Sequence, residues 1–272
     1  MQTNELLTTI ATHGFPTNRA HLIHAFIGGS TLHGVKLDGT DDLDLYGIYI
    51  ENPIDTIWER FEHFVTSTSP QEERNTKDDV DVTCYSLRKF AHLALAGNPT
   101  ILQMLFTPAQ YGEVYWSWVL GHRDKFLAKS HIKKYMGYAD SQLKRMMKLK
   151  GQGKHGQRPE LEQRFGYDTK AAMHVFRLLF EGMQLVSEGW ITFPRPEPER
   201  SYLLSIRKGE HSQDWVIQEA NRLFAQCREV GEKSKLPEHP NRRFVGEMVT
   251  EIYRDYWQKQ VDQVVNAFLA RW

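Results

Sequence analysis

Two acidic residues, Asp42 and Asp44, stand one residue apart in a segment that follows a glycine-rich break at residues 28–30. In a strand, side chains alternate between two faces, so these carboxylates point to the same side. Two carboxylates that close repel one another unless a cation lies between them, and such hard oxygen ligands suit Mg²⁺. Upstream, glycine lets the backbone approach a ligand, and the helix start that follows offers free N–H groups to phosphate. The pattern predicts adjoining phosphate and metal sites, which nucleotide chemistry requires.

Each half of this pattern also has a simpler explanation. The Gly28-Gly29-Ser30 sequence could be an ordinary turn, and Asp-x-Asp sequences more often lie on a solvated strand edge than in a metal site. Their order, the length of chain between them and the strand that follows favour the joint, functional interpretation.

A two-metal phosphoryl-transfer site needs a further carboxylate on a neighbouring strand, because two ions about 3.5–4 Å apart share their acidic ligands. Three residues compete for this position, namely Asp78, Asp79 and Asp81. Residues 80–85 alternate as a strand, with Asp81 inside it, whereas Asp78 and Asp79 belong to the preceding polar stretch. Strand alternation therefore favours Asp81, although a charge on an edge strand would produce the same pattern.

The elements that must position these residues change in character along the chain. We expect a short helix over residues 4–14 and a helix capped by Ser86. Strands are predicted at residues 22–27, 43–51 and 80–85. Long helical patterns then dominate, at residues 116–129, 132–150, 167–188, 215–229 and 243–272. The sequence predicts an α+β fold, in which a catalytic domain with a mixed sheet and helices (1–114) precedes a mainly helical domain (115–272).

Composition narrows the partners and the setting. The 272 residues carry 34 Lys and Arg against 34 Asp and Glu, so a nucleic acid would have to meet a local patch of charge. The two cysteines, Cys84 and Cys227, have no metal-ligand spacing and predict no disulfide framework, which favours a reducing, cytoplasmic setting. We expect neither a secretory signal nor a membrane partner, because no apolar run approaches the roughly 20 residues of a membrane span.

Several motifs resemble those of a known family. The signature of the DNA polymerase β-like nucleotidyltransferase superfamily is matched by Gly29-Ser30, Gly34, Asp42-x-Asp44 and Gly47. Further sequence blocks resemble those of the RNA-repair-pathway branch of that superfamily. They lie at residues 81–90, 93–99, 102–106, 166–179, 206–210 and 234–238. One departure is local. The family has Ser before the first metal-binding Asp, whereas this chain has Asp41, which should face away from Asp42.

This resemblance implies a metal-dependent nucleotidyltransferase, which moves a nucleoside monophosphate from an NTP to an acceptor hydroxyl and releases pyrophosphate. Asp42 and Asp44 would bind two Mg²⁺ ions, for which Mn²⁺ could substitute. Asp81 would complete the metal site and help to deprotonate the acceptor. Gly29 and Ser30 would hold the β- and γ-phosphates.

One predicted helix face carries Lys170, His174 and Arg177 at positions i, i+4 and i+7. Three basic groups on one face repel each other unless an anion or carboxylates lie opposite, and a triphosphate is such an anion. A solvated face, or salt bridges to Asp168 and Glu181, would explain the stripe equally well. The family resemblance favours contact of Lys170 and Arg177 with the triphosphate.

A basic segment over residues 133–158 holds eight Lys and Arg residues, with Asp140 as its only acid and aromatic residues interleaved. Such clusters hold phosphate backbones, and exposed bases stack on aromatic rings, although a run of charge is also commonly a solvated face. We expect an RNA acceptor to be bound here by four residues, namely Lys144, Lys148, Lys150 and Lys154.

Two other functions stay open. The acceptor could be a protein or small-molecule hydroxyl, as in other branches of the superfamily, or the chain could be a non-catalytic nucleotide- or RNA-binding module. The presence of all three acids argues against a non-catalytic module, since a protein that only binds has no need for a costly acidic cluster. The resemblance implies an RNA 3′ end, such as that of damaged tRNA, as the acceptor, and it leaves the oligomeric state open.

We predict that Asp81, and neither Asp78 nor Asp79, is the third acid of the site. Asp81→Asn should lower turnover on the order of 100-fold or more, as expected for the loss of a directly placed electrostatic group. Asp78→Asn and Asp79→Asn should leave turnover almost unchanged. Transfer of label from an NTP measures all three variants, and equal losses at Asp79 and Asp81 would show that the strand begins earlier than predicted.

Overall fold

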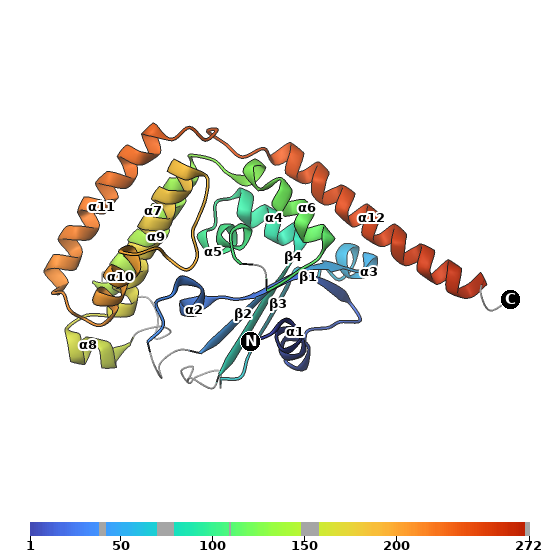
Figure 1. Cartoon of the computed structure of the whole chain (residues 1–272), viewed down its shortest axis with the longest axis horizontal. Helices are drawn as coiled ribbons and strands as arrows, with labels where there is room; N and C mark the ends of the chain where they lie inside the picture. Colours follow the sequence, from blue (N-terminus) through green and yellow to red (C-terminus); the bar gives the residue numbers. More distant parts are fainter. Residues whose placement is uncertain (38–41, 70–78, 109, 148–157, 270–272) are drawn as a thin grey trace.

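The computed structural model has an α+β fold around one mixed five-stranded sheet, as the sequence predicts (Figure 1). It describes residues 1–37, 42–69, 79–108, 110–147 and 158–269, with side chains described as far as residue 262. The strands are β1 (Ala20–Ile27), β2 (Leu43–Glu51), β3 (His63–Ser67), β4 (Val80–Ser86) and β5 (Tyr111–Gly112). Their order in the sheet is β3-β4-β2-β1-β5.

Strand pairing brings the two acid-bearing strands side by side. β2 pairs in parallel with β4 and places Asp44 opposite Asp81, while β1 lies antiparallel on the other side of β2. β3 and β5 are antiparallel edge strands that the sequence patterns did not predict. Because adjacent residues in a parallel pair share a face, Asp44 and Asp81 project from the same side of the sheet.

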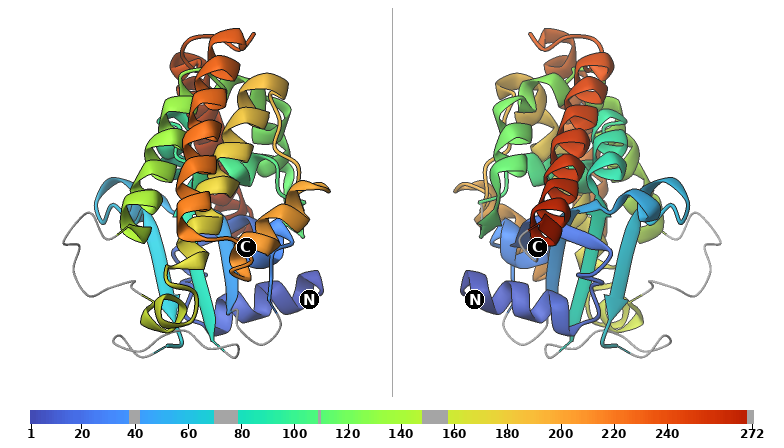
Figure 2. Two further views of the ribbon diagram at one scale, coloured as in Figure 1. Left: turned by 90° about the vertical axis from the view of Figure 1, so that its left-hand side faces the viewer. Right: turned by 90° about the vertical axis from the view of Figure 1, so that its right-hand side faces the viewer.

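The two faces of the sheet are covered differently. One face packs on α1 (Thr3–Thr12), whose Leu6 and Ile10 join a core with Leu45 and Val82. On the other face lie α4 (Leu87–Leu95), which begins as predicted with Ser86 accepting a hydrogen bond from the Lys89 N–H, and α5 (Pro99–Leu102). The side views of Figure 2 show the later helices stacked over the face opposite α1.

The second half of the chain is helical, as predicted. Figure 1 shows α7, α9, α10 and α11 grouped at one end of the molecule, while α12 runs along the other. These elements are α6 (Val114–Gly121), α7 (His131–Met146), α8 (Pro159–Phe165), α9 (Thr169–Glu188), α10 (Glu199–Arg207), α11 (Gln213–Lys233) and α12 (Arg242–Leu269). The first half also contains the short helices α2 (Gly29–His33) and α3 (Pro53–Ile57). None of the helices in the described ranges is long and apolar enough to cross a lipid bilayer.

One expected helix, over residues 116–129, is wrong as a single element. α6 ends at Gly121, a 3-10 turn covers Arg123–Phe126, and Leu127 is extended. The apolar core nevertheless runs without a break from the sheet into the later helices, with Phe90, Trp116 and Phe176 in one cluster. The division into domains at residue 115 stays a prediction, and the core is continuous across it.

Buried histidines predict a loss of stability in mild acid. Burial lowers the pKa of His24, His33 and His131 from 6.5 to about 4. Between about pH 6.5 and pH 4 the unfolded chain therefore binds protons that the folded protein does not, so stability falls as pH falls through this window and is fully present above it.

We predict that His131→Phe flattens this pH dependence by roughly 1 kcal/mol per pH unit between pH 6 and pH 5, because one titrating group is removed. Urea unfolding at a series of pH values measures the slope. A wild-type slope in His131→Phe would contradict the neutral, buried state of this imidazole.

Candidate active site

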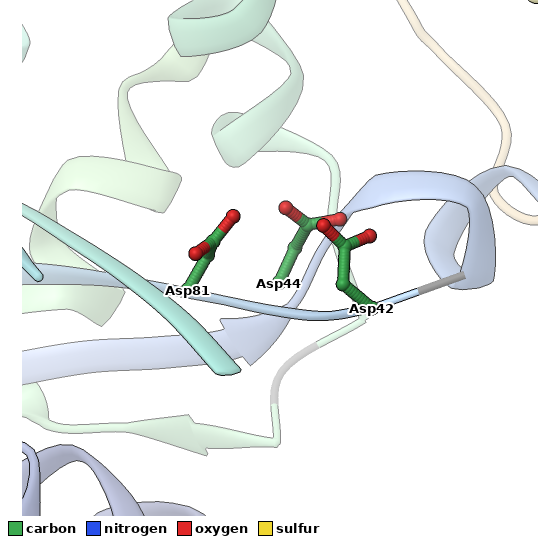
Figure 3. Close-up of side chains that lie close together, drawn as sticks. All are labelled: Asp42, Asp44 and Asp81. Atoms are coloured by element: carbon green, nitrogen blue, oxygen red, sulfur yellow. The ribbon is translucent and has the colours of Figure 1, made fainter. Parts of the chain in front are cut away.

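The structure brings together the three acids that the sequence singles out. Asp42 directly precedes β2, Asp44 is its second residue, and Asp81 is the second residue of β4. Figure 3 shows the three side chains rising from neighbouring strands toward one another. One carboxylate oxygen of each lies within 4.8 Å of the others, and all three residues are half-buried. Three converging carboxylates match the oxygen ligands that hard divalent cations require, so these residues fit a metal site.

Gly29 fixes how closely the chain approaches Asp44. Its φ is +56°, in the left-handed region, and a Cβ at this position would lie 1.8 Å from Oδ2 of Asp44. The preceding residue, Gly28, donates its backbone N–H to the Asp44 carbonyl at 2.9 Å. Glycine is therefore required at position 29 for two reasons, namely its positive φ and the closeness of the Asp44 carboxylate.

A cavity of about 290 Å³ opens next to the acids, between the sheet and α9. All four residues expected to bind the nucleotide line it, two from α2 (Gly29 and Ser30) and two from α9 (Lys170 and Arg177). Its remaining lining residues are His33, Val35, Asp42, Asp44, Tyr46, Thr100, Gln103, Arg158, Met173, His174 and Arg207. The cavity thus joins acidic strand ends to a cationic helix face.

The α9 stripe both faces the cavity and makes a salt bridge. Lys170, His174 and Arg177 all line the cavity. Arg177 also pairs with Glu181, its Nη1 lying 3.1 Å from Oε1 of the buried carboxylate. Asp168, the other acid considered, caps α9 by accepting a hydrogen bond from the Ala171 N–H at 2.9 Å. The two explanations of the stripe are therefore compatible, since a carboxylate behind Arg177 leaves it at the cavity wall.

Electrostatics define the charge states on this wall. Burial and the nearby cations, Arg177 before Lys170, hold the pKa of His174 well below its usual value, so this imidazole is neutral at physiological pH. Burial opposes ionisation of Glu181, but the cations around it, Arg177 first, outweigh burial and lower its pKa to about 2. A neutral imidazole thus lies between two cationic side chains of α9.

Some lining residues were not assigned a role from the sequence. His33 lies between the glycine-rich break and Gly34, and Arg207 lies in the block at residues 206–210, so both stand inside motifs that carry the family resemblance. Gln103 is a buried polar residue in an apolar run, which could have marked it. Only position within a motif could have marked His33 and Arg207 as functional. The spacing between these residues in the sequence does not indicate that their side chains meet.

The expected acceptor-binding residues are only partly described. Lys144 lies in the last turn of α7 and pairs with Asp140 at 2.6 Å, and it does not line the cavity. Lys148, Lys150 and Lys154 lie outside the described residues. Their role in binding an acceptor stays a prediction.

We predict that Gly29→Ala disables the site, because the new methyl group would displace the Asp44 carboxylate and strain a backbone with positive φ. Transfer activity should fall on the order of 100-fold or more, as for the loss of a directly placed charged group. Gly14→Ala is the matched control, because Gly14 has φ +92° and open space around its Cβ position. This control should cost about 1 kcal/mol of stability and leave activity intact. Full activity in Gly29→Ala would contradict the close approach to Asp44.

Comparison with known proteins identifies the family. The chain matches the RNA repair pathway DNA polymerase beta family over residues 2–247. Over 120 residues it is 31% identical to an uncharacterized 38.9 kDa protein of enterobacteria phage T4. The aligned region covers 42% of this chain and 35% of the phage protein. The chain therefore matches about a third of the length of that relative.

The chain also aligns with the crystal structure of a nucleotidyltransferase-like protein from Exiguobacterium sibiricum 255-15. The alignment covers 95% of this chain and 74% of the other chain, at 12% sequence identity and a TM-score of 0.29. The family match spans nearly the whole chain and confirms the resemblance seen in its motifs. This chain belongs to the RNA repair pathway DNA polymerase beta family.

Proposed function

We propose that this protein is a nucleotidyltransferase, which moves a nucleoside monophosphate from an NTP to the 3′ hydroxyl of an RNA and releases pyrophosphate. One observation carries the proposal, which is that a single cavity joins two kinds of charge. Asp42 and Asp44 line it on the strand side with Asp81 beside them, while Lys170 and Arg177 line it on the α9 side. An NTP needs both, because its phosphates are anionic and its reacting phosphate is handled with divalent cations.

Asp42 and Asp44 are the proposed ligands of two Mg²⁺ ions, or of Mn²⁺ in their place, and Asp81 completes the set. When bound, the metal neutralises charge on the attacking and leaving oxygens. The proposed role of Asp81 is also to take the proton of the acceptor hydroxyl. A carboxylate within hydrogen-bond reach of the acceptor can do this during the transfer.

The remaining residues act by positioning the substrate. In the proposed reaction the acceptor oxygen forms a bond to the α-phosphorus, and the bond from that phosphorus to the bridging oxygen of pyrophosphate breaks. Gly29 and Ser30 hold the β- and γ-phosphates from α2, and Lys170 and Arg177 meet them from α9. Little covalent chemistry is left to the protein in phosphoryl transfer, so placement and charge account for most of the rate.

An RNA acceptor is supported by the family description and by the basic segment. The segment from residue 133 to 158 runs from α7 to the start of α8, and its last residue, Arg158, lines the cavity. The cations of this segment would contact the backbone of a polynucleotide whose 3′ end reaches the acids. A protein or small-molecule acceptor would require no such segment.

We predict that the protein, an α-labelled NTP and Mg²⁺ extend an RNA that ends in a 3′ hydroxyl and leave a 3′-blocked RNA unlabelled. EDTA should abolish labelling. Asp44→Asn should lower it on the order of 100-fold or more while the fold persists. Asp124→Asn is the matched control, because Asp124 is an exposed acid that pairs with Lys125.

Gel electrophoresis of the RNA and release of pyrophosphate report the reaction. Preferential labelling of a protein or a small molecule would overturn the RNA acceptor. Normal, metal-independent turnover of Asp44→Asn would overturn the assignment of the acidic site.

A further inference from the structure

A buried polar network joins the end of α2 to α9 beside the cavity. It consists of His33, Arg177 and Glu181, and the exposed fractions of His33 and Glu181 are 5% and 0%. Nη1 of Arg177 donates to Nε2 of His33 at 3.0 Å and to the two carboxylate oxygens of Glu181 at 3.1 and 3.2 Å. Nδ1 of His33 lies 3.0 Å from Oε1 of Glu181, an electrostatic contact without hydrogen-bond geometry. Polar groups buried to this extent are expected to have fixed partners.

The network has one protonation state at neutral pH. Burial, and then the Arg177 guanidinium, lower the pKa of His33 to about 4, so the imidazole is neutral. Glu181 is ionised, because its cationic neighbours overcome the effect of burial and its pKa is about 2. Since Nε2 of His33 accepts from Arg177, the imidazole hydrogen belongs on Nδ1, next to Glu181. Arg177 is thereby held by hydrogen bonds to both His33 and Glu181.

These contacts occupy one corner of the Arg177 guanidinium. The hydrogen bonds that it makes within the described part of the chain all start from Nη1. Its Nε is buried and has no hydrogen-bond partner there. Nε and Nη2 form one edge of the planar group, and such an edge matches two oxygens of a phosphate. Arg177 lines the cavity, so a polyphosphate bound there would lie beside its guanidinium. Nε has no access to solvent, and a small shift of the side chain would bring it to a phosphate oxygen.

Further contacts fix the position of His33 from the second half of the chain. The backbone N–H of Arg195 donates to the His33 carbonyl at 3.1 Å, and the Phe193 ring packs edge-on against the imidazole at a centroid distance of 5.3 Å. Arg207 donates to the carbonyl of Val35, just beyond α2. The imidazole is therefore held firmly enough to orient the guanidinium that it contacts.

We propose that His33 and Glu181 are positioning residues, which hold Arg177 so that its Nε and Nη2 edge binds a polyphosphate. The ligand is the triphosphate of the NTP or the pyrophosphate that leaves it, and this choice of ligand rests on the proposed function. His33 acts through Arg177 as a neutral hydrogen-bond acceptor and does not touch the reacting phosphate.

Two variants of His33 separate hydrogen bonding from packing. His33→Phe keeps an aromatic ring against Phe193 but removes the acceptor, whereas His33→Gln offers one acceptor and one donor, as the neutral imidazole does. The probe is inorganic tripolyphosphate in the presence of Mg²⁺, and its binding to the full chain is followed by calorimetry.

His33→Phe should raise the Kd of tripolyphosphate and the KM of the NTP by about tenfold or more, the scale of a lost hydrogen bond to a charged group. His33→Gln should stay within about threefold of wild type. The KM of the acceptor should not change in either variant, whereas a general loss of structure would change it as well. His239→Phe, at an exposed site, is the control for added ring surface.

Arg177→Lys keeps the charge and lacks the planar edge, so it too should weaken tripolyphosphate binding by about tenfold. This variant tests the edge even if His33→Phe does not fold. The inference fails if Arg177→Lys binds tripolyphosphate as wild type does, if His33→Phe is folded and binds normally, or if His33→Gln loses as much affinity as His33→Phe.

Binding of tripolyphosphate requires no acceptor and no turnover, so the two proposals can fail separately. Loss of binding in His33→Phe, together with an absence of RNA labelling by wild type, would uphold the positioning role and overturn the proposed function. RNA labelling by wild type with normal tripolyphosphate binding in His33→Phe would do the reverse.

Discussion

The mutual repulsion of three carboxylates is the constraint around which the first half of the chain is arranged. Asp42, Asp44 and Asp81 are held within 4.8 Å of one another by the parallel pairing of β2 and β4. Their strands can hold them because alternate residues such as Leu45 and Val82 are fully buried on the opposite face. Each such burial contributes about 1.5–3 kcal/mol. The sheet thus keeps the acids close before any cation binds, and a cation that binds there relieves their repulsion.

The second constraint is that the two walls of the cavity come from distant parts of the chain and have to keep a fixed separation. α2 provides the connection. Gly34, with φ +70°, lies so close to the second half that a Cβ there would be 2.9 Å from the Pro194 side chain. The Arg195 N–H reaches the His33 carbonyl, and Arg207 reaches that of Val35. A site that works mainly by placement depends on such connections, since small displacements of phosphate ligands are costly.

Local patterns carried the parts of this structure that the sequence could predict. Period-two alternation identified β4 and placed Asp81 within it, and the Ser86 cap fixed where α4 begins. Contacts between distant segments could not be predicted in this way. The pairing of His33 with Arg177 spans 144 positions, and nothing in the spacing around either residue encodes it. β3 was missed for a related reason, because an edge strand with exposed alternate residues resembles a polar loop. The acidic pair and its strand were thus predictable, whereas the network behind the cationic wall was not.

The charge of the whole site suggests why its acids and cations belong to one cavity. Among the described residues that line the cavity or pair with its lining, four are cations, namely Arg158, Lys170, Arg177 and Arg207. Two carboxylates, Asp42 and Asp44, also line it with Asp81 beside them, and Asp168 and Glu181 pair with Arg158 and Arg177 from behind the wall. These acids offset part of the positive charge that would attract a triphosphate. Divalent ions held by Asp42, Asp44 and Asp81 would restore that charge, so the metal and the nucleotide should bind with mutual dependence.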